Sequence, residues 1–278
     1  MARSMTPTEK QRFRGYFPNL NVDQAVVTGE VSPVYNCISW TVGITDRWLW
    51  PGSGISDFDA FYRGFGYVHA ADGPIAAWGL STSNMTHGCV SGPGHGSRWE
   101  SKCGRDLRIQ HGLNELVGAS YGRVLAFYRR NRLLEAPFEA LLESSMKQKT
   151  SKSYLTASEK KAIGAQVKSV PEEVREKFEG AFEAWKATWF EGGLAISSAP
   201  QSRAVGKPFD ALVALGPAIL PLVVEKLADP DNFFALTLYD AIQPNEKLIV
   251  QFAPGDERVL EGEQGRAKRV VQAWFANQ

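Results

Sequence analysis

Cysteine is scarce in this sequence of 278 residues, and neither charge is in excess. Three cysteines are an odd number and too few for a disulfide framework, which suits a reducing compartment. Lys and Arg together number 31, and Asp and Glu number 30. Because these charges nearly cancel, no overall field would hold the chain on a nucleic acid or an anionic membrane. We therefore expect no nucleic-acid partner.

Long apolar runs and a phosphate-binding loop are missing as well. The first residues, MARSMTPTEKQRFRGYF, lack the apolar core of a signal peptide. No later window reaches the roughly 18 apolar residues that a membrane-spanning helix needs. The glycine-rich stretch GPGHGSR lacks the Gly-Lys-Ser/Thr ending of a phosphate loop, so nucleotide chemistry is not indicated. These absences predict a soluble, cytoplasmic protein with no membrane partner.

Composition changes along the chain and predicts two domains. Up to about Arg130 the sequence is rich in Gly, Trp and short apolar runs, whereas the later part is richer in Ala, Leu and Glu. A polar stretch with several lysines separates the two parts, and such a run is usually solvated. We predict a first domain at 1–143, a polar linker at 144–169 and a helical domain at 170–278.

Local patterns predict a mixture of helices and strands in the first domain. A short helix should begin at Cys37, with Asn36 as its N-cap. The spacing of three phenylalanines predicts a second helix over 56–65. Strands are expected at 83–90 and 97–104, and they are joined by a Gly-rich turn as a β-hairpin. A further helix is expected over 109–118.

The second domain has helical periodicity throughout but carries no catalytic signature. An amphipathic helix is predicted after Pro171, because large apolar residues recur there every three or four positions. Two short helices broken at Gly216 and Pro217 should follow, and then a final helix over 266–275. Such a helical module suggests binding of a partner protein, positioning of a substrate or control of the first domain.

The first domain offers a candidate nucleophile and a candidate base. A cysteine thiolate is stabilised by a helix N-terminus and by a nearby imidazolium. Cys37 has the first of these, and His87 could supply the second. On its strand, His87 shares one face with Cys89, while Gly88 lies on the other face.

The hairpin predicts a polar partner for the histidine. If the turn centres on Gly94, Ser101 lies opposite His87, and its hydroxyl could orient the imidazole ring. A register slip of one residue would present Glu100 instead. Both Ser101 and Glu100 therefore stand as candidates for the third member of a triad.

The ordered motifs SPVYNCISW, DRWLWP, THGCV, WESKCG and YGRVLAFYRR resemble an uncharacterised bacterial domain family. That family has an Asn-Cys-x-x-Trp motif, a histidine-bearing strand and a Trp-x-Ser-Lys-x-Gly strand, and it is similar to the papain-like superfamily, which includes cell-wall endopeptidases. The resemblance implies an α+β fold in which a helix with an N-terminal cysteine packs on a small antiparallel sheet, followed here by a small all-α domain. It also implies that Cys37 is the nucleophile and His87 the general base, with Ser101 or Glu100 as the orienting residue.

These observations favour a cysteine-dependent hydrolase that acts on a peptide or other amide bond through a Cys-His pair, without a metal or cofactor. Its substrate would be a peptide or a protein. The alternative is a catalytically inactive interaction protein whose helical domain binds a partner, since a lone cysteine is most often a packing residue. A structural zinc site is the rival chemical interpretation, and it would use two imidazoles and two thiolates as ligands. Its ligands would be His87, Cys89, His95 and Cys103.

Overall fold

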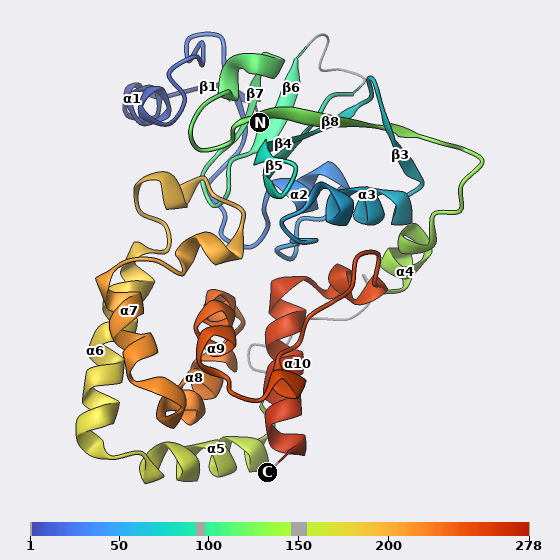
Figure 1. The fold of residues 1–278 in the computed structure, drawn as a ribbon. Helices are drawn as coiled ribbons and strands as arrows, with labels where there is room; N and C mark the ends of the chain where they lie inside the picture. Colours follow the sequence, from blue (N-terminus) through green and yellow to red (C-terminus); the bar gives the residue numbers. More distant parts are fainter. Residues whose placement is uncertain (1, 93–97, 146–154, 278) are drawn as a thin grey trace. The chain divides into compact units, whose positions relative to one another are not determined.

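The computed structural model describes residues 2–92, 98–145 and 155–277, which form two compact units (Figure 1). Unit 1 comprises Met1–Lys147, Gly192–Ala199 and Ala253–Leu260. Unit 2 comprises the remaining segments, Gln148–Glu191, Pro200–Phe252 and Glu261–Gln278. Unit 1 is therefore built from three separate stretches of the sequence.

Unit 1 contains an antiparallel sheet of eight strands in the order β1-β2-β7-β6-β5-β4-β8-β3. The predicted hairpin is present as β5 and β6, and its turn residues 93–97 lie outside the described ranges. The strands are β1 (Arg3–Ser4), β2 (Val26–Gly29), β3 (Tyr67–Ala70), β4 (Ile75–Ser81), β5 (Asn84–Val90), β6 (Trp99–Lys102), β7 (Arg108–His111) and β8 (Arg123–Arg130).

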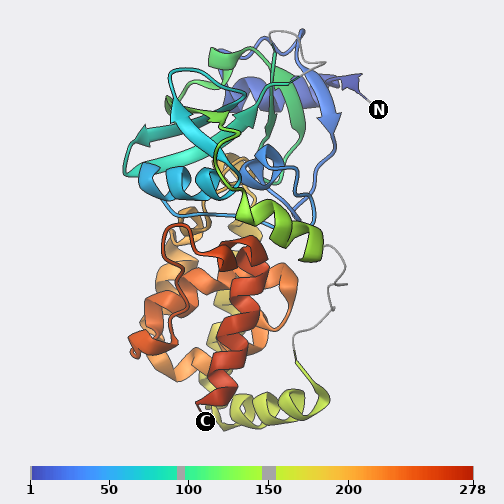
Figure 2. The ribbon, with the colours of Figure 1, turned by 90° about the vertical axis from the view of Figure 1, so that its right-hand side faces the viewer.

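Side-chain caps fix the start of two of the helices of unit 1. The N-terminal helix α1 starts after Thr6, whose hydroxyl accepts the backbone N–H of Glu9. The two helices predicted near 37 and 56 are present as α2 and α3, and both lie beside the sheet (Figures 1 and 2). The helices are α1 (Pro7–Tyr16), α2 (Cys37–Thr41), α3 (Ile55–Gly64) and α4 (Pro137–Ser145), with the 3-10 helix η1 (Leu113–Leu116).

The prediction of a helix over 109–118 is wrong. Residues Arg108–His111 form strand β7, and only the short 3-10 helix Leu113–Leu116 follows. The apolar residues at 109, 113 and 116 suggested a helical period, but Ile109 packs in the sheet because β7 pairs with both β2 and β6. Pairing in the sheet therefore overrides a short local periodicity.

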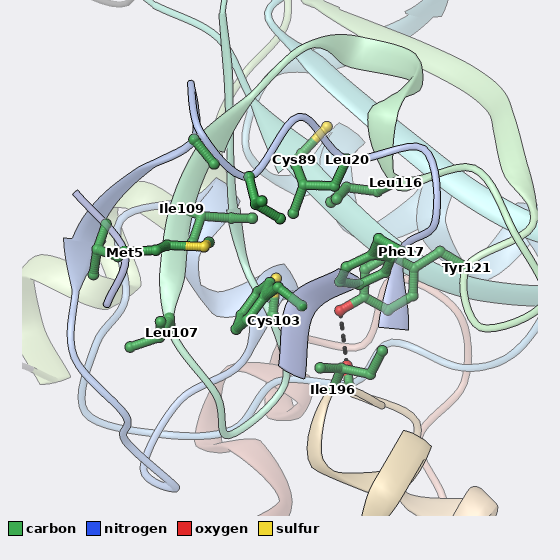
Figure 3. Close-up of a cluster of buried hydrophobic side chains, with 14 of the residues drawn as sticks. Met5, Phe17, Leu20, Cys89, Cys103, Leu107, Ile109, Leu116, Tyr121 and Ile196 are labelled. Carbon is green, nitrogen blue, oxygen red and sulfur yellow. Dashed lines mark hydrogen bonds between the residues drawn. The ribbon is translucent and has the colours of Figure 1, made fainter. Parts of the chain in front are cut away.

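Strand β5 has a different environment on each of its faces. Cys89 joins a buried cluster with Trp78, Cys103 and Tyr121 (Figure 3). The opposite face, at Gly88, meets α2, and a Cβ at Gly88 would lie 3.1 Å from the Ile38 Cδ1 atom. The absence of a side chain at this position lets α2 lie close against the strand that carries His87.

Unit 2 is helical and has an aromatic and aliphatic interior. The predicted amphipathic helix is present, with Phe178, Phe182 and Trp185 buried. The break at Gly216 and Pro217 is also present, as a 3-10 turn between two short helices. The helices are α5 (Ala157–Ser169), α6 (Glu172–Thr188), α7 (Lys207–Ala214), α8 (Leu220–Leu227), α9 (Leu236–Ile242) and α10 (Gly262–Ala276). The 3-10 segments of unit 2 are η3 (Pro200–Arg203), η4 (Gly216–Ile219), η5 (Pro230–Ala235) and η6 (Glu246–Leu248). The segment η2 (Gly192–Ala195) lies in unit 1, and η7 (Glu257–Glu261) begins in unit 1.

The stretch predicted as a polar linker, 144–169, contains helix α5. The side chain of Thr156 accepts the backbone N–H of Glu159, and the Glu159 carboxylate accepts the backbone N–H of Thr156. This reciprocal capping box starts the helix, and Ile163 is buried on it. The capping signal is visible in the sequence, whereas the lysines nearby suggest only a solvated loop. The rest of this stretch includes 146–154, which lie outside the described residues.

Within the described ranges, no single helix is both long and apolar enough to cross a membrane. Helix α7 together with the segment Gly216–Leu227 reaches that length and composition, but the pair is bent by 97°.

Candidate functional site

Cys37 is the first residue of α2, and its position is fixed by the residue before it. The Asn36 Oδ1 atom accepts the backbone N–H of Ser39 at 3.0 Å, which caps the helix. The Asn36 Nδ2 atom donates to the carbonyl of Leu49 at 2.7 Å. Both hydrogen bonds are buried, so the Asn36 side chain fixes the start of α2. This confirms Asn36 as the predicted N-cap.

The Cys37 thiol is fully buried and neutral in this structure. Its Sγ atom donates a hydrogen bond to the Ser198 Oγ atom at 3.1 Å. Burial raises the pKa of the thiol to about 11, although hydrogen bonding by Ser198 and by the backbone of Gly88 opposes this shift. The thiol is therefore protonated at neutral pH, and its partner comes from a distant segment that sequence reasoning missed.

Ser101 joins two buried imidazoles into one hydrogen-bonded chain. Its Oγ atom lies 2.8 Å from the Nε2 atom of His87 and 2.8 Å from the Nε2 atom of His111. The Nδ1 atom of His111 lies 2.7 Å from the carbonyl of Gly112. All three side chains are fully buried. Strands β5, β6 and β7, which are neighbours in the sheet, each supply one member of this chain.

The protons of this chain can be assigned from the acceptor at its end. A carbonyl only accepts, so the His111 Nδ1 atom carries the proton and its Nε2 atom must accept from the Ser101 hydroxyl. The Ser101 oxygen then accepts from the His87 Nε2–H group. The Nδ1 atom of His87 consequently has a lone pair, and it is buried with no hydrogen-bond partner among the described residues.

Both histidines are neutral bases in this environment. Burial lowers the pKa of His87 well below its usual value, and protonation of His111 would lower it further. Burial also lowers the pKa of His111, to about 4, against the opposing effect of its hydrogen bond to Gly112. The His87 ring stacks on Tyr121 with 3.9 Å between ring centroids, which holds the plane of the imidazole.

Ser101 reaches His87 through a register that differs from the expected one. The observed pair Val90↔Glu100 places Ser101 across from Cys89 rather than from His87. A shift of two residues preserves the face of the strand, so Ser101 contacts His87 as a diagonal neighbour. Glu100 points elsewhere: the Arg108 Nε atom lies 2.9 Å from its carboxylate, and Thr28 also contacts it.

Cys37 and His87 lie in one neighbourhood but do not form a hydrogen bond among the described residues. The sulfur of Cys37 is near enough that its charge would raise the pKa of Tyr121, the residue stacked on His87. The backbone of Gly88, directly after His87, hydrogen bonds the same sulfur. The structure thus brings the predicted nucleophile beside the strand of the predicted base, with each side chain bonded to a serine.

Lys102 is a second buried polar group that sequence reasoning did not assign. Its Nζ atom donates to the carbonyls of Ser32, Gly104 and Asp106, at 3.1, 2.6 and 2.7 Å. Burial lowers its pKa to about 7, and its charge slightly lowers the pKa of Cys37. Three carbonyl acceptors match the three N–H groups of the ammonium form. Its place in the Trp-x-Ser-Lys-x-Gly motif is the one sequence signal that marks it.

The remaining candidates are core residues or fall outside the described ranges. Cys89 and Cys103 are fully buried, and the Cys89 Sγ atom accepts from Trp78 Nε1 at 3.3 Å. In the described part of the chain, no group of three or more His, Cys, Asp or Glu side chains could hold a metal ion. His95, the fourth residue of the possible zinc set, lies outside the described residues.

The fold and the site define an α+β unit in which a cysteine at a helix start lies against a strand that carries a buried histidine. Residues 26–129 match the family model of a domain of unknown function, DUF7689. The match contains Cys37, His87, Ser101 and His111, whereas Ser198 lies beyond it. No curated protein and no solved structure matches the chain.

Proposed function

We propose that unit 1 is a papain-like cysteine hydrolase that cleaves a peptide or other amide bond, and that the structure is its closed form. The observation that carries this proposal is the free lone pair on the His87 Nδ1 atom, in a ring whose other nitrogen is bonded to Ser101. A neutral imidazole with one nitrogen oriented and the other available is the arrangement that a general base requires.

The chemistry starts when the Cys37 thiol leaves Ser198 and meets His87. His87 takes the thiol proton, and the thiolate attacks the substrate carbonyl to form a C–S bond. Backbone N–H groups near the sulfur stabilise the resulting oxyanion. The C–N bond then breaks, and the leaving amine takes the proton from His87. Water, deprotonated by His87, attacks the thioester, which releases the acid and restores the Cys37 thiol.

Alkylation of Cys37 by iodoacetamide at pH 7, followed by mass spectrometry, tests this proposal. We expect Cys37 to react faster than Cys89 and Cys103, and His87→Gln to slow it at least about tenfold, because general-base removal costs that much or more. His69→Gln is the matched control, since His69 is on β3 of the same unit with 46% of its side chain exposed. An unchanged Cys37 rate in His87→Gln would overturn the hydrolase assignment.

A direct assay complements the labelling experiment. The full chain is incubated with a digest of unrelated proteins, and new peptide termini are identified by mass spectrometry. We expect cleavage that disappears in Cys37→Ala. If neither cleavage nor His87-dependent labelling is found, the second candidate holds: the neutral, buried thiol favours an inactive unit, and the helical unit 2 would then bind a partner protein.

A further inference from the structure

A short segment from late in the sequence forms part of unit 1. Residues 192–199 belong to it, whereas α6 before them and Pro200–Arg203 after them belong to unit 2. The segment comprises η2, Gly192–Ala195, followed by residues without regular structure. We call residues 192–199 the return segment.

Unit 1 donates several hydrogen bonds to the backbone of the return segment. Three of its carbonyls accept hydrogen bonds from donors in unit 1, one of them shown in Figure 3. The pairs are Arg105 N–H with Ala195 O at 2.9 Å, the Tyr121 hydroxyl with Ile196 O at 2.8 Å, and Trp48 Nε1 with Ser198 O at 2.8 Å. Recognition of carbonyls does not depend on side-chain identity, so these donors can hold any polypeptide that fits.

The side chains of the return segment fill the space beside the thiol. Ile196 is fully buried in the cluster that contains Cys103 and Tyr121 (Figure 3). Ser198 is fully buried with its hydroxyl against the Cys37 sulfur. A Cβ atom added at Gly104 would lie 2.6 Å from the carbonyl carbon of Ile196, so the backbone of the segment lies directly on this loop.

Two of the three donors that hold this segment, the side chains of Trp48 and Tyr121, are themselves buried. Trp48 and Tyr121 are at most 1% exposed, and an indole N–H or phenol O–H in such a position needs an acceptor. The carbonyls of Ser198 and Ile196 meet this need in the closed form. If the return segment left, the same donors would be available to the carbonyls of another chain.

We propose that Trp48, Tyr121 and the backbone of Arg105 form a polypeptide-binding site that takes a small residue beside Cys37, and that the return segment occupies this site as an internal ligand. A small residue is required because Ser198 leaves no exposed space at the sulfur. This binding site names a polypeptide as the substrate class, and the proposal rests on the proposed function only for the cleavage step. Binding of a polypeptide, and covering of Cys37 by the return segment, do not depend on that function.

The gating half is tested with two conservative variants of the full chain. Trp48→Phe and Tyr121→Phe each remove one donor and keep an aromatic ring. We expect either variant to raise the rate of Cys37 alkylation at pH 8 by at least about fivefold, the equivalent of one ordinary hydrogen bond. Tyr128→Phe is the matched control, because the hydroxyl of Tyr128 contacts Asp59 rather than the segment. Equal rates in all four proteins would overturn the proposal.

The binding half uses the peptide GGLAISSAP, the sequence of residues 192–200. We expect Ile196→Asp to displace the return segment. If that variant does not fold, the double variant Trp48→Phe with Ser198→Gly takes its place. We expect this peptide to protect Cys37 from alkylation, whereas GGLADSSAP does not. If Cys37 were alkylated faster in the variant but the peptide did not protect it, the return segment would only cover the thiol, and the proposed polypeptide-binding site would be wrong. This assay measures the accessibility of the Cys37 thiol and does not depend on catalysis. If His87→Gln left the Cys37 alkylation rate unchanged, the hydrolase assignment would be wrong, but the result on peptide binding would still hold.

Discussion

The two units bury different kinds of groups. All three cysteines and all four histidines of the sequence precede residue 112, so unit 2 has neither side chain. Its interior is built from packed rings such as Trp185 and Trp189, whose centroids are 5.1 Å apart in an edge-to-face arrangement. Unit 1 instead buries a hydrogen-bonded chain of titratable groups beside a thiol. The difference teaches that packing and ion pairs such as Arg266–Glu263 account for unit 2, whereas the buried imidazoles and thiol of unit 1 call for a chemical explanation.

A buried cation of unit 2, Arg203, shows the same contrast. Arg203 is 1% exposed, and its guanidinium lies 4.3 Å from the centroid of the Phe234 ring. Its Nε atom donates to the carbonyl of Trp189 at 3.2 Å. Burial lowers its pKa to about 9. Here a charged group is enclosed by aromatic rings and backbone, with no imidazole or thiol beside it.

The largest expected effect comes from a substitution in the packed interior of unit 2. Trp185→Ala removes a fully buried ring and its hydrogen bond to the carbonyl of Arg203, so it should lower the free energy of unfolding by about 3–5 kcal/mol. Urea unfolding followed by circular dichroism at 222 nm measures this change. Trp274→Ala, at a half-buried ring on α10, is the control and should cost clearly less. Equal losses would mean that Trp185 does not anchor the core.

A smaller loss of stability is expected in unit 1 at acidic pH. The pKa values of His87 and His111 are lower in the folded chain than the unfolded value of about 6.5, so the unfolded state binds more protons below that pH. Their contribution to stability is complete above pH 6.5 and is lost as the pH falls towards about 4. At pH 5 His111 should cost about 2 kcal/mol, and His87 should add to the loss in the same direction.

Thiol accessibility of Cys89 and Cys103 during urea unfolding reports on unit 1, where both are buried. We expect a marked loss of stability between pH 7.5 and pH 5 in the wild type. The double variant His87→Gln with His111→Gln should show a much flatter pH dependence, whereas His69→Gln should keep the wild-type slope. The same slope in the double variant would show that these imidazoles are not the acid-sensitive groups.

The smallest effect separates Ser101 from Glu100. Ser101→Ala removes the hydroxyl that orients His87 but leaves the base in place, so Cys37 alkylation at pH 7 should slow about fivefold, as for one lost hydrogen bond. Glu100→Gln should leave the rate unchanged, since that carboxylate contacts Arg108 and Thr28. A larger effect of Glu100→Gln would assign the orienting role to the carboxylate.

Local sequence predicts the parts of the site that are local. The Asn-Cys helix start follows from the capping rule, and the hairpin pattern brings Ser101 to His87 even though the register is two residues off. The part played by His111 is not predicted by the sequence, because the local pattern favours a helix over 109–118 and the contact depends on β7 pairing with β6. Ser198 is 161 positions from Cys37, and no local rule links a serine near a 3-10 turn to a distant thiol.

The division of unit 1 into three stretches of sequence also sets an order of events during synthesis. Chains emerge from the ribosome N-terminus first, and domains fold as units once their residues are available. Cys37, His87, Ser101 and His111 are all synthesised well before the return segment that supplies Ser198. For that interval the nascent unit has Cys37 and His87 without the return segment. We therefore expect Cys37 to be most open to oxidants and electrophiles on the ribosome, before the chain has closed its own site.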